Sequence, residues 1–264
     1  DGPNLGDFPE PTALLGGDAG VFSLLTATAC LPLVEETHHR LGIPEAHIEG
    51  VAKWIAGTVI LYRSGHQGRP GHGLRQMYWL KYHIQGKLFC VGRFEYMIED
   101  VHPDFPAIYR SQKTGEVIAF CRDKWRLGKD GYRVKDDDPD GTPCCFTEMD
   151  HQITGVVVNT ATGRADVAMI RTVDSSEYFP VLAPHDWVPS IHIPAGGGMT
   201  PEAVKESLRQ ALTFFKTYFG RELKAFSCFS WILNPDLMEE LPDSNITKFM
   251  KMVSLFPAAP SPTC

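Results

Sequence analysis

Residues 191–201 read Ile-His-Ile-Pro-Ala-Gly-Gly-Gly-Met-Thr-Pro, and this stretch decides how the chain can fold. The apolar run that ends at Ile193 predicts a strand, the glycines at 196–198 predict a tight turn, and Pro201 fits the first position of a helix. Glycines let the backbone approach a bulky anion, and the free N–H groups of a first helical turn attract one. We expect a phosphorylated cofactor at this turn; the alternative is a plain strand-to-helix connection.

The helix after the turn has clear start and stop signals. Thr200 can cap it, Glu202 suits its positive end and Gly220 ends it. Its apolar residues recur on one face: Val204, Leu208, Ala211, Leu212, Phe215 and Phe219. The Gly-x-Gly-x-x-Gly spacing and the Gly-Lys-Ser/Thr ending of known phosphate loops are both missing, so the glycines alone leave both interpretations open.

Composition describes a globular protein with an acidic surface. The chain has 264 residues, 43% of them apolar, and a formal net charge of −7. Because binding to nucleic acids or membrane surfaces needs clustered Lys and Arg, we expect neither partner. Seven cysteines without disulfide or metal spacing indicate free thiols, and no signal peptide or membrane-length apolar run is seen, so we expect a cytoplasmic protein.

The pattern of elements predicts an α+β chain. Apolar spacing of three and four residues favours helices over 18–41, with a kink at Pro32, over 48–62 and over 74–82. Strand-length runs rich in β-branched and aromatic residues follow at 88–98, 117–121, 146–149, 153–159, 179–182, 188–193 and 226–233, and short helices at 235–241 and 245–253. We therefore predict a helical N-terminal domain over 1–80 and a mixed, mostly antiparallel sheet flanked by helices over 81–264.

Three segments carry a family resemblance: the run 192–201 with its helix, the stretch Ser-Cys-Phe-Ser-Trp-Ile-Leu-Asn-Pro at 227–235, and Leu-Pro-Asp-Ser-Asn-Ile at 241–246. Together they resemble the GNAT-like C-terminal domain of a bacterial acyltransferase-like family, over roughly residues 85–256. The helices before them resemble that family's N-terminal domain. The resemblance implies a GNAT-like fold and a donor such as acetyl-CoA or another acyl-CoA.

In the wider GNAT superfamily a central strand splays from its neighbour, and the turn after it binds the CoA pyrophosphate at the start of a helix. The resemblance implies that 188–193 is this strand and 226–233 its neighbour. The turn would then bind the cofactor through Ala195, Gly196, Gly197, Gly198, Met199 and Thr200. The superfamily turn usually reads Gln/Arg-x-x-Gly-x-Gly/Ala, whereas here no Gln or Arg leads it.

Direct acyl transfer to an amine needs a base for the ammonium proton and a donor for the departing thiolate. We expect the catalytic residues to be His192, which titrates near neutral pH, and Cys228 and Ser230, which share one face of the predicted strand. The alternatives are a hydrogen-bonded core histidine and a small buried polar pair.

The acceptor would lie against Trp231, Asn234 and Asn245, although Asn234 also suits a turn and Asn245 suits a helix start. Glu95, Glu99 and Asp100 end a predicted strand and could recruit a cationic amine, or simply be solvated charges.

No metal site is predicted. Residues 136–141 read Asp-Asp-Asp-Pro-Asp-Gly, like the start of a calcium loop, but its twelfth position is Thr147 and strands flank it. We interpret it as a solvated acidic turn. The histidine pairs His66/His72 and His38/His39 lack a third ligand at metal spacing.

The leading hypothesis is an acyl-CoA-dependent N-acyltransferase that acts on a small amine by direct transfer. The alternative is a non-catalytic ligand-binding or interaction module on a GNAT scaffold that has lost CoA binding. An open cleft beside the glycine turn would favour catalysis, whereas a cleft filled by Trp187, Trp231 or the N-terminal helices would favour the module. The sequence leaves the acceptor, the acyl length and the oligomeric state open.

Overall fold

The computed structural model describes residues 11–102, 104–196 and 198–258, which form two compact units. Unit 1 comprises the described residues up to Ile98 together with Pro189–Cys228, and unit 2 comprises Glu99–Val188 and the described residues from Phe229 onward. Each unit is thus built from two separate pieces of chain. The described residues confirm an α+β chain with N-terminal helices followed by antiparallel sheet.

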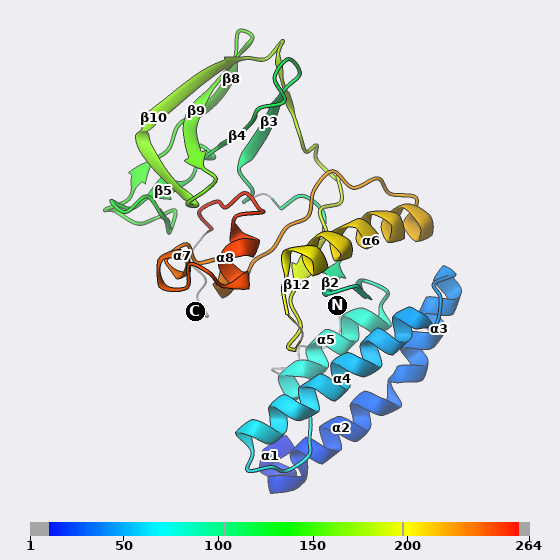
Figure 1. Ribbon diagram of the computed structural model, residues 1–264. Coiled ribbons are helices and arrows are strands. Elements are labelled where there is room, and N and C mark those ends of the chain that lie inside the picture. The colour runs from blue at the N-terminus through cyan, green and yellow to red at the C-terminus, as the bar shows by residue number, and fades with distance from the viewer. Residues whose placement is uncertain (1–10, 103, 197, 259–264) are drawn as a thin grey trace. The chain divides into compact units, whose positions relative to one another are not determined.

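Unit 1 is a three-stranded antiparallel sheet between helices (Figure 1). The strands lie in the order β1, β2, β12, and one helix, α6, packs on the face that carries Phe89 and Tyr96. The opposite face meets the N-terminal helices, because a Cβ on Gly50 of α4 would lie 2.6 Å from the Cβ of Cys90. The elements are α1 (Pro11–Leu15), α2 (Ala19–Ala29), α3 (Leu31–Leu41), α4 (Ala46–Gly65), α5 (Leu74–Ile84), β1 (Leu88–Val91), β2 (Phe94–Met97), β12 (Ser190–His192) and α6 (Pro201–Phe219).

The N-terminal helices form because their apolar residues can be buried together. Ala27, Val34, Val51, Ile55 and Leu80 make one buried cluster across α2 to α5. The predicted kink is a break between α2 and α3. Pro32 lies in the first turn of α3, where its missing N–H breaks no helical hydrogen bond. The stretch Thr12–Leu41 has the length and apolar character of a membrane span, although it is divided among separate helices. The absence of a membrane partner stays a prediction.

Unit 2 holds a six-stranded antiparallel sheet in the order β10, β9, β4, β3, β11, with β8 paired to β9, and a small sheet in the order β6, β5, β7 (Figure 1). Its core gathers large side chains such as Trp125 and Phe120. The elements are β3 (Ala107–Ser111), β4 (Val117–Phe120), β5 (Arg126–Leu127), β6 (Arg133–Val134), β7 (Thr142–Pro143), β8 (Phe146–Met149), β9 (Gln152–Asn159), β10 (Arg164–Asp174), β11 (Tyr178–Pro180), α7 (Leu237–Glu240) and α8 (Asn245–Met250).

Two predicted features differ from the structure. The predicted strand over 226–233 is wrong: only Ser227 pairs, in a single parallel bridge with Ser190, and Trp231–Leu233 forms a 3-10 helix. The predicted boundary at residue 80 lies inside unit 1, because α4 and α5 pack on β1. Whether residues 1–80 are a domain in their own right stays a prediction.

Candidate active site

The glycine turn joins β12 to α6 as the sequence predicts. Thr200 caps the helix, since its side-chain oxygen accepts a hydrogen bond from the backbone N–H of Ala203 at 3.3 Å. Gly196 has φ +80°, a left-handed conformation that suits glycine. Of the residues predicted to bind the cofactor, Gly197 lies outside the described residues.

Arg93 holds this turn from another part of the chain. Its side chain donates from Nε to the carbonyl oxygen of Gly198 at 3.1 Å and from a terminal nitrogen to that of Pro194 at 3.0 Å. Burial lowers the pKa of Arg93 and the charge of Glu95 opposes this, but a guanidinium keeps its proton in a protein. No leading Gln or Arg stands in the turn, yet a cation reaches it from the β1–β2 hairpin.

The turn has room for a ligand close to its backbone. A Cβ added to Gly196 would meet nothing within 4 Å, and one added to Gly198 would meet only the Thr200 side chain, at 3.8 Å. Two carbonyl groups of the turn are engaged by Arg93, and the helix start at Thr200 is exposed. These features fit a bulky anion such as a pyrophosphate, because nothing near Gly196 or Gly198 blocks its approach.

Ser207 of α6 fixes the hairpin that carries Arg93. Its buried hydroxyl donates to the carbonyl oxygen of Val91 at 2.7 Å and accepts from the backbone N–H groups of Arg93 at 3.1 Å and Phe94 at 3.3 Å. The hydroxyl of Tyr96 lies 2.9 Å away. The helix after the turn and the arginine that holds the turn are therefore locked together.

His192 ends β12, half-buried against the ring of Trp79 at a centroid distance of 4.6 Å. Its Nε2 is buried and has no hydrogen-bond partner among the described residues. Burial lowers the pKa of His192 and the charge of Glu95 raises it, with burial the larger effect. The imidazole is therefore neutral near pH 7 and able to accept a proton.

Cys228 lies in unit 1 just after the point where strand pairing stops. Ile191 donates to the carbonyl oxygen of Ser227 at 2.7 Å, and Ser227 donates to that of Pro189 at 3.1 Å; residues 228–258 form no strand. Burial raises the pKa of the Cys228 thiol to about 11, so it is a thiol and not a nucleophilic thiolate at neutral pH.

The other predicted site residues lie in unit 2. Ser230 precedes the 3-10 helix without capping it, and Trp231 is 76% exposed, so it fills no space inside its own unit. Asn234 accepts from the backbone N–H of Asp236 at 3.1 Å, which is a turn contact. Asn245 is the first residue of α8, whose cap is Ser244. The structure thus groups His192, Cys228 and the described turn residues in one unit and these four in the other.

Sequence reasoning missed a buried polar row in unit 1. Glu95 is only 4% exposed, so its interpretation as a solvated strand-end charge is wrong. Its carboxylate lies 3.7 Å from His83 Nε2 and 3.5 Å from the Cys90 sulfur. No motif could have revealed this, because α5, β1 and β2 bring together residues that follow no known spacing.

These three side chains could also surround a metal, since their ligand atoms lie within 4.8 Å of one another. Burial and the neighbouring Glu95 hold the pKa of the Cys90 thiol well above its usual value, so the sulfur is a hydrogen-bond donor here. The hydrogen bond from the Cys90 sulfur to Glu95 accounts for two of the three side chains, and the absence of a metal stays a prediction.

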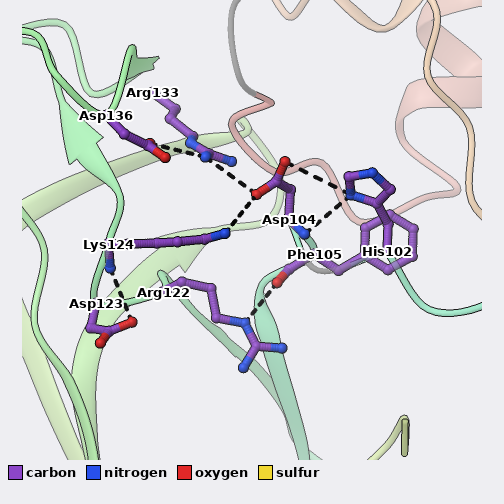
Figure 2. A network of polar contacts seen from close by, with 8 residues as sticks. All are labelled: His102, Asp104, Phe105, Arg122, Asp123, Lys124, Arg133 and Asp136. Atoms are coloured by element: carbon purple, nitrogen blue, oxygen red, sulfur yellow. Dashed lines mark hydrogen bonds and ion pairs between the residues drawn. The ribbon is translucent and has the colours of Figure 1, made fainter. Parts of the chain in front are cut away.

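The acidic stretch 136–141 in unit 2 is largely exposed, and its first residue, Asp136, joins a network of ion pairs. Asp136 pairs with Arg133 at 3.0 Å, and Arg133 and Lys124 both reach Asp104, at 3.4 and 3.2 Å (Figure 2). Burial raises the pKa of Asp104, but the hydrogen bond from Lys124 and the charge of Arg133 together lower it further than burial raises it. This network braces the loops of unit 2 and contains none of the predicted site residues.

A hollow of about 510 Å³ also belongs to unit 2. It lies along β9 and the start of β10, where the pairing of these strands is interrupted between Ala165 and Ile170. None of the predicted site residues lines it.

Comparison with known proteins adds the family. The family model of the GNAT-like C-terminal domain matches residues 88–263, which is more than half of the chain. No curated protein sequence matches the chain.

Solved structures share the fold. An acyltransferase crystallised with decanoyl-CoA and teicoplanin is 21% identical, with a TM-score of 0.52 over 98% of this chain and 58% of that one. An acyltransferase with CoA and 10C-teicoplanin gives the same identity and TM-score over 98% and 57%. A mutant with octanoyl-CoA gives 21% and 0.52 over 98% and 58%. The chain spans just over half the length of these proteins. On the strength of the family match and the shared fold, the chain belongs to the family of GNAT-like C-terminal domains.

Proposed function

We propose that this protein is an acyl-CoA-dependent N-acyltransferase that transfers an acyl group directly to an amine of a small molecule. The observation that carries the proposal is the glycine turn, which is open at Gly196 and Gly198, leads into a capped helix and is held by Arg93. Structures with the same fold were crystallised with decanoyl-CoA, octanoyl-CoA and teicoplanin. They support a fatty acyl donor and a small-molecule acceptor.

The pyrophosphate of the donor would bind at the turn and at the start of α6. The residues that would hold it are Ala195, Gly196, Gly198, Met199 and Thr200, together with Gly197, which is outside the described residues. An acyl-CoA supplies the acyl group as a thioester. The turn contributes its backbone N–H groups and the helix dipole, both of which favour a negative charge.

His192 would take the proton that the attacking amine loses as its nitrogen bonds to the acyl carbon. His192 is the last residue of β12, just before the turn, and it is neutral near pH 7 because burial lowers its pKa. A neutral imidazole is suited to accept a proton directly or through a water molecule.

Cys228 would act on the leaving sulfur. An ordinary thiol has a pKa of about 8.5, so the departing thiolate is a weaker base than the thiolate of Cys228 would be and does not remove the Cys228 proton. With its pKa raised to about 11, Cys228 would donate a hydrogen bond and keep its proton. The roles of Ser230, Trp231, Asn234 and Asn245, which belong to unit 2, stay predictions from the sequence.

We also propose a cytoplasmic location. All six cysteines that the structure describes are free, as expected for a protein kept in a reducing compartment.

Titration calorimetry with CoA, acetyl-CoA, octanoyl-CoA and decanoyl-CoA tests the proposal. The Gly198→Ala variant is expected to weaken binding at least tenfold, because its methyl group meets only Thr200 within the protein but occupies the space where the anion approaches. Gly57→Ala in α4 is the matched control, since that position is also open and away from the turn. Absence of binding up to millimolar concentrations would overturn the proposal.

An assay of thiol release with a panel of small amines separates the two function hypotheses. An N-acyltransferase releases one thiol for each acylated amine. Binding of acyl-CoA with no turnover on any amine of the panel would instead support the non-catalytic binding module.

A further inference from the structure

The face of the unit 1 sheet that carries His192 bears a continuous polar row. Cys90 of β1 and His192 of β12 are both direct cross-strand partners of Glu95 in β2. Directly opposite residues of antiparallel strands point to the same face, with Cβ atoms about 5 Å apart. The three side chains therefore lie side by side across the sheet, and Glu95 is in the middle.

The N-terminal helices cover this row. Trp79 of α5 lies against His192, and Gly50 of α4 lies against Cys90. His83, also on α5, approaches Glu95 to 3.7 Å. The carboxylate at 4% exposure is thus shut away from water, where a negative charge is costly unless positive or hydrogen-donating groups surround it.

The groups around Glu95 differ in how strongly they stabilise its buried negative charge. Cys90 donates a weak hydrogen bond at 3.5 Å, and the charge of Arg93 acts on Glu95 from the hairpin. His83 is fully buried, has no hydrogen-bond partner for either ring nitrogen among the described residues, and faces a second buried histidine, His38. A positive charge formed on His192 would therefore add to the compensation that Cys90 and Arg93 give the carboxylate.

We propose that Glu95 is a positioning residue for acyl transfer, because it faces His192 across the strands and stabilises the imidazolium that forms when His192 takes the proton of the amine. No bond to Glu95 forms or breaks; the proton moves from the amine nitrogen to the imidazole, and the carboxylate keeps its charge. This inference rests on the proposed function. The carboxylate also opposes, in part, the effect of burial on the pKa of His192.

The test is a titration of His192 by NMR in protein with labelled histidine, which needs no activity. Glu95→Gln removes the charge with little change of shape, and the pKa of His192 is expected to fall by about one pH unit or more. Glu49→Gln, an exposed carboxylate of α4 in the same unit, is the matched control and is expected to leave the titration unchanged. An unchanged His192 titration in folded Glu95→Gln would overturn the proposal.

If Glu95→Gln fails to fold, two measurements remain. The side-chain carboxyl carbon of Glu95 in the wild-type protein is expected to show the chemical shift of a carboxylate at pH 7, and a protonated carboxyl would overturn the proposal. Glu95→Asp keeps the charge, so the pKa of His192 is expected to stay closer to wild type than in Glu95→Gln; a fall as large as that caused by Gln would count against it.

Kinetics separates this inference from the proposed function. In Glu95→Gln, kcat is expected to fall about tenfold or more with KM for acyl-CoA unchanged, and the acidic limb of the pH profile is expected to move to lower pH. If the NMR shift is found but the protein acylates no amine, the function proposal fails and the pairing of Glu95 with His192 stands. If the enzyme is active and the pKa of His192 is the same in wild type and Glu95→Gln, only this inference fails.

Discussion

His38 of α3 is the residue with the clearest effect on stability. It is fully buried, its ring lies 5.6 Å from that of Phe89, and neither nitrogen has a hydrogen-bond partner among the described residues. Burial, with a smaller contribution from nearby histidines including His83, lowers its pKa from 6.5 to about 4. The unfolded chain therefore binds this proton more readily than the folded chain does.

The first prediction follows from this difference in proton binding between the unfolded and the folded chain. Stability is complete above pH 6.5 and falls as the pH drops towards 4, by up to about 3 kcal/mol from this residue. His38→Leu is expected to remove this part of the pH dependence, and the exposed His39→Leu is the control. Denaturant unfolding at a series of pH values checks it; equal slopes in wild type and His38→Leu between pH 4 and 6.5 would contradict it.

At this scale the sequence predicted part of the site. His192, the Thr200 cap and the glycine conformation at 196 follow from neighbours along the chain, so local rules suffice for them. The sequence named Glu95 as a candidate, but the contacts of Arg93 with the turn and of Glu95 with His192 could not be predicted, because about a hundred residues separate these partners. Glu95 stands out from other strand residues only because its carboxylate is buried, and burial is not visible in the sequence.

The element that matters most is the β1–β2 hairpin. It holds the glycine turn through Arg93, and it is held in turn by Ser207 of α6. Gly92 at its tip has φ +62°, and a Cβ there would lie 2.9 Å from the Cα of Ser207, so the close approach of hairpin and helix requires glycine.

Substituting the arginine gives a second prediction. Arg93→Lys keeps the positive charge but offers one point donor in place of the two separate nitrogens that reach Pro194 and Gly198. The turn should lose its fixed shape, and CoA is expected to bind about tenfold more weakly, or about 1.4 kcal/mol. Calorimetry measures this, with the exposed Arg209→Lys on α6 as control. Identical affinities for the two variants would refute the role of Arg93.

Ser207→Ala gives a third prediction. The change removes the four contacts that one buried hydroxyl makes with the hairpin. We expect a loss of about 2 kcal/mol or more in the unfolding free energy. Urea denaturation of this variant beside Ser64→Ala, an exposed serine of α4, provides the comparison. Equal midpoints for the two would show that the hydroxyl does not stabilise the hairpin.

Elements with strong local patterns were predicted well, and elements set by tertiary pairing were not. The helices of α2 to α6 follow their apolar spacing. The longest strand, β10, was missed because Arg164–Asp174 is largely exposed and lacks the apolar alternation of a half-buried strand. The run after Phe226 has strand composition but finds a partner only at Ser227, so it continues as loop and 3-10 helix.

For the whole molecule, the division of the chain is the main result. Both units are assembled from two chain pieces, with crossings after Ile98, Val188 and Cys228. The α+β class and the N-terminal helices were predictable from periodicity. The way β1 and β2 join those helices was not, because their burial on both faces gives no signal of which partner covers each face.

A fragment of residues 81–264 gives the fourth prediction. It lacks helix α4, which covers Cys90, and all five buried residues of the cluster described above, Ala27 to Leu80. We expect it to fail to form the native β1–β2–β12 sheet alone and to recover it when the fragment 1–80 is added. Amide NMR spectra and binding of a hydrophobic dye follow both states. Native, dispersed signals for these strands in the isolated fragment would instead support the predicted boundary at residue 80.

The hairpin also limits how this chain can change in length. Arg93 lies at the tip of the hairpin and reaches the glycine turn. Glu95, two residues later in β2, lies on the helix-covered face beside His192. Side chains alternate along a strand, and one inserted or deleted residue between them would move Glu95 to the α6 face and bring an aromatic neighbour among the histidines. The start of β2 therefore has a fixed number of residues.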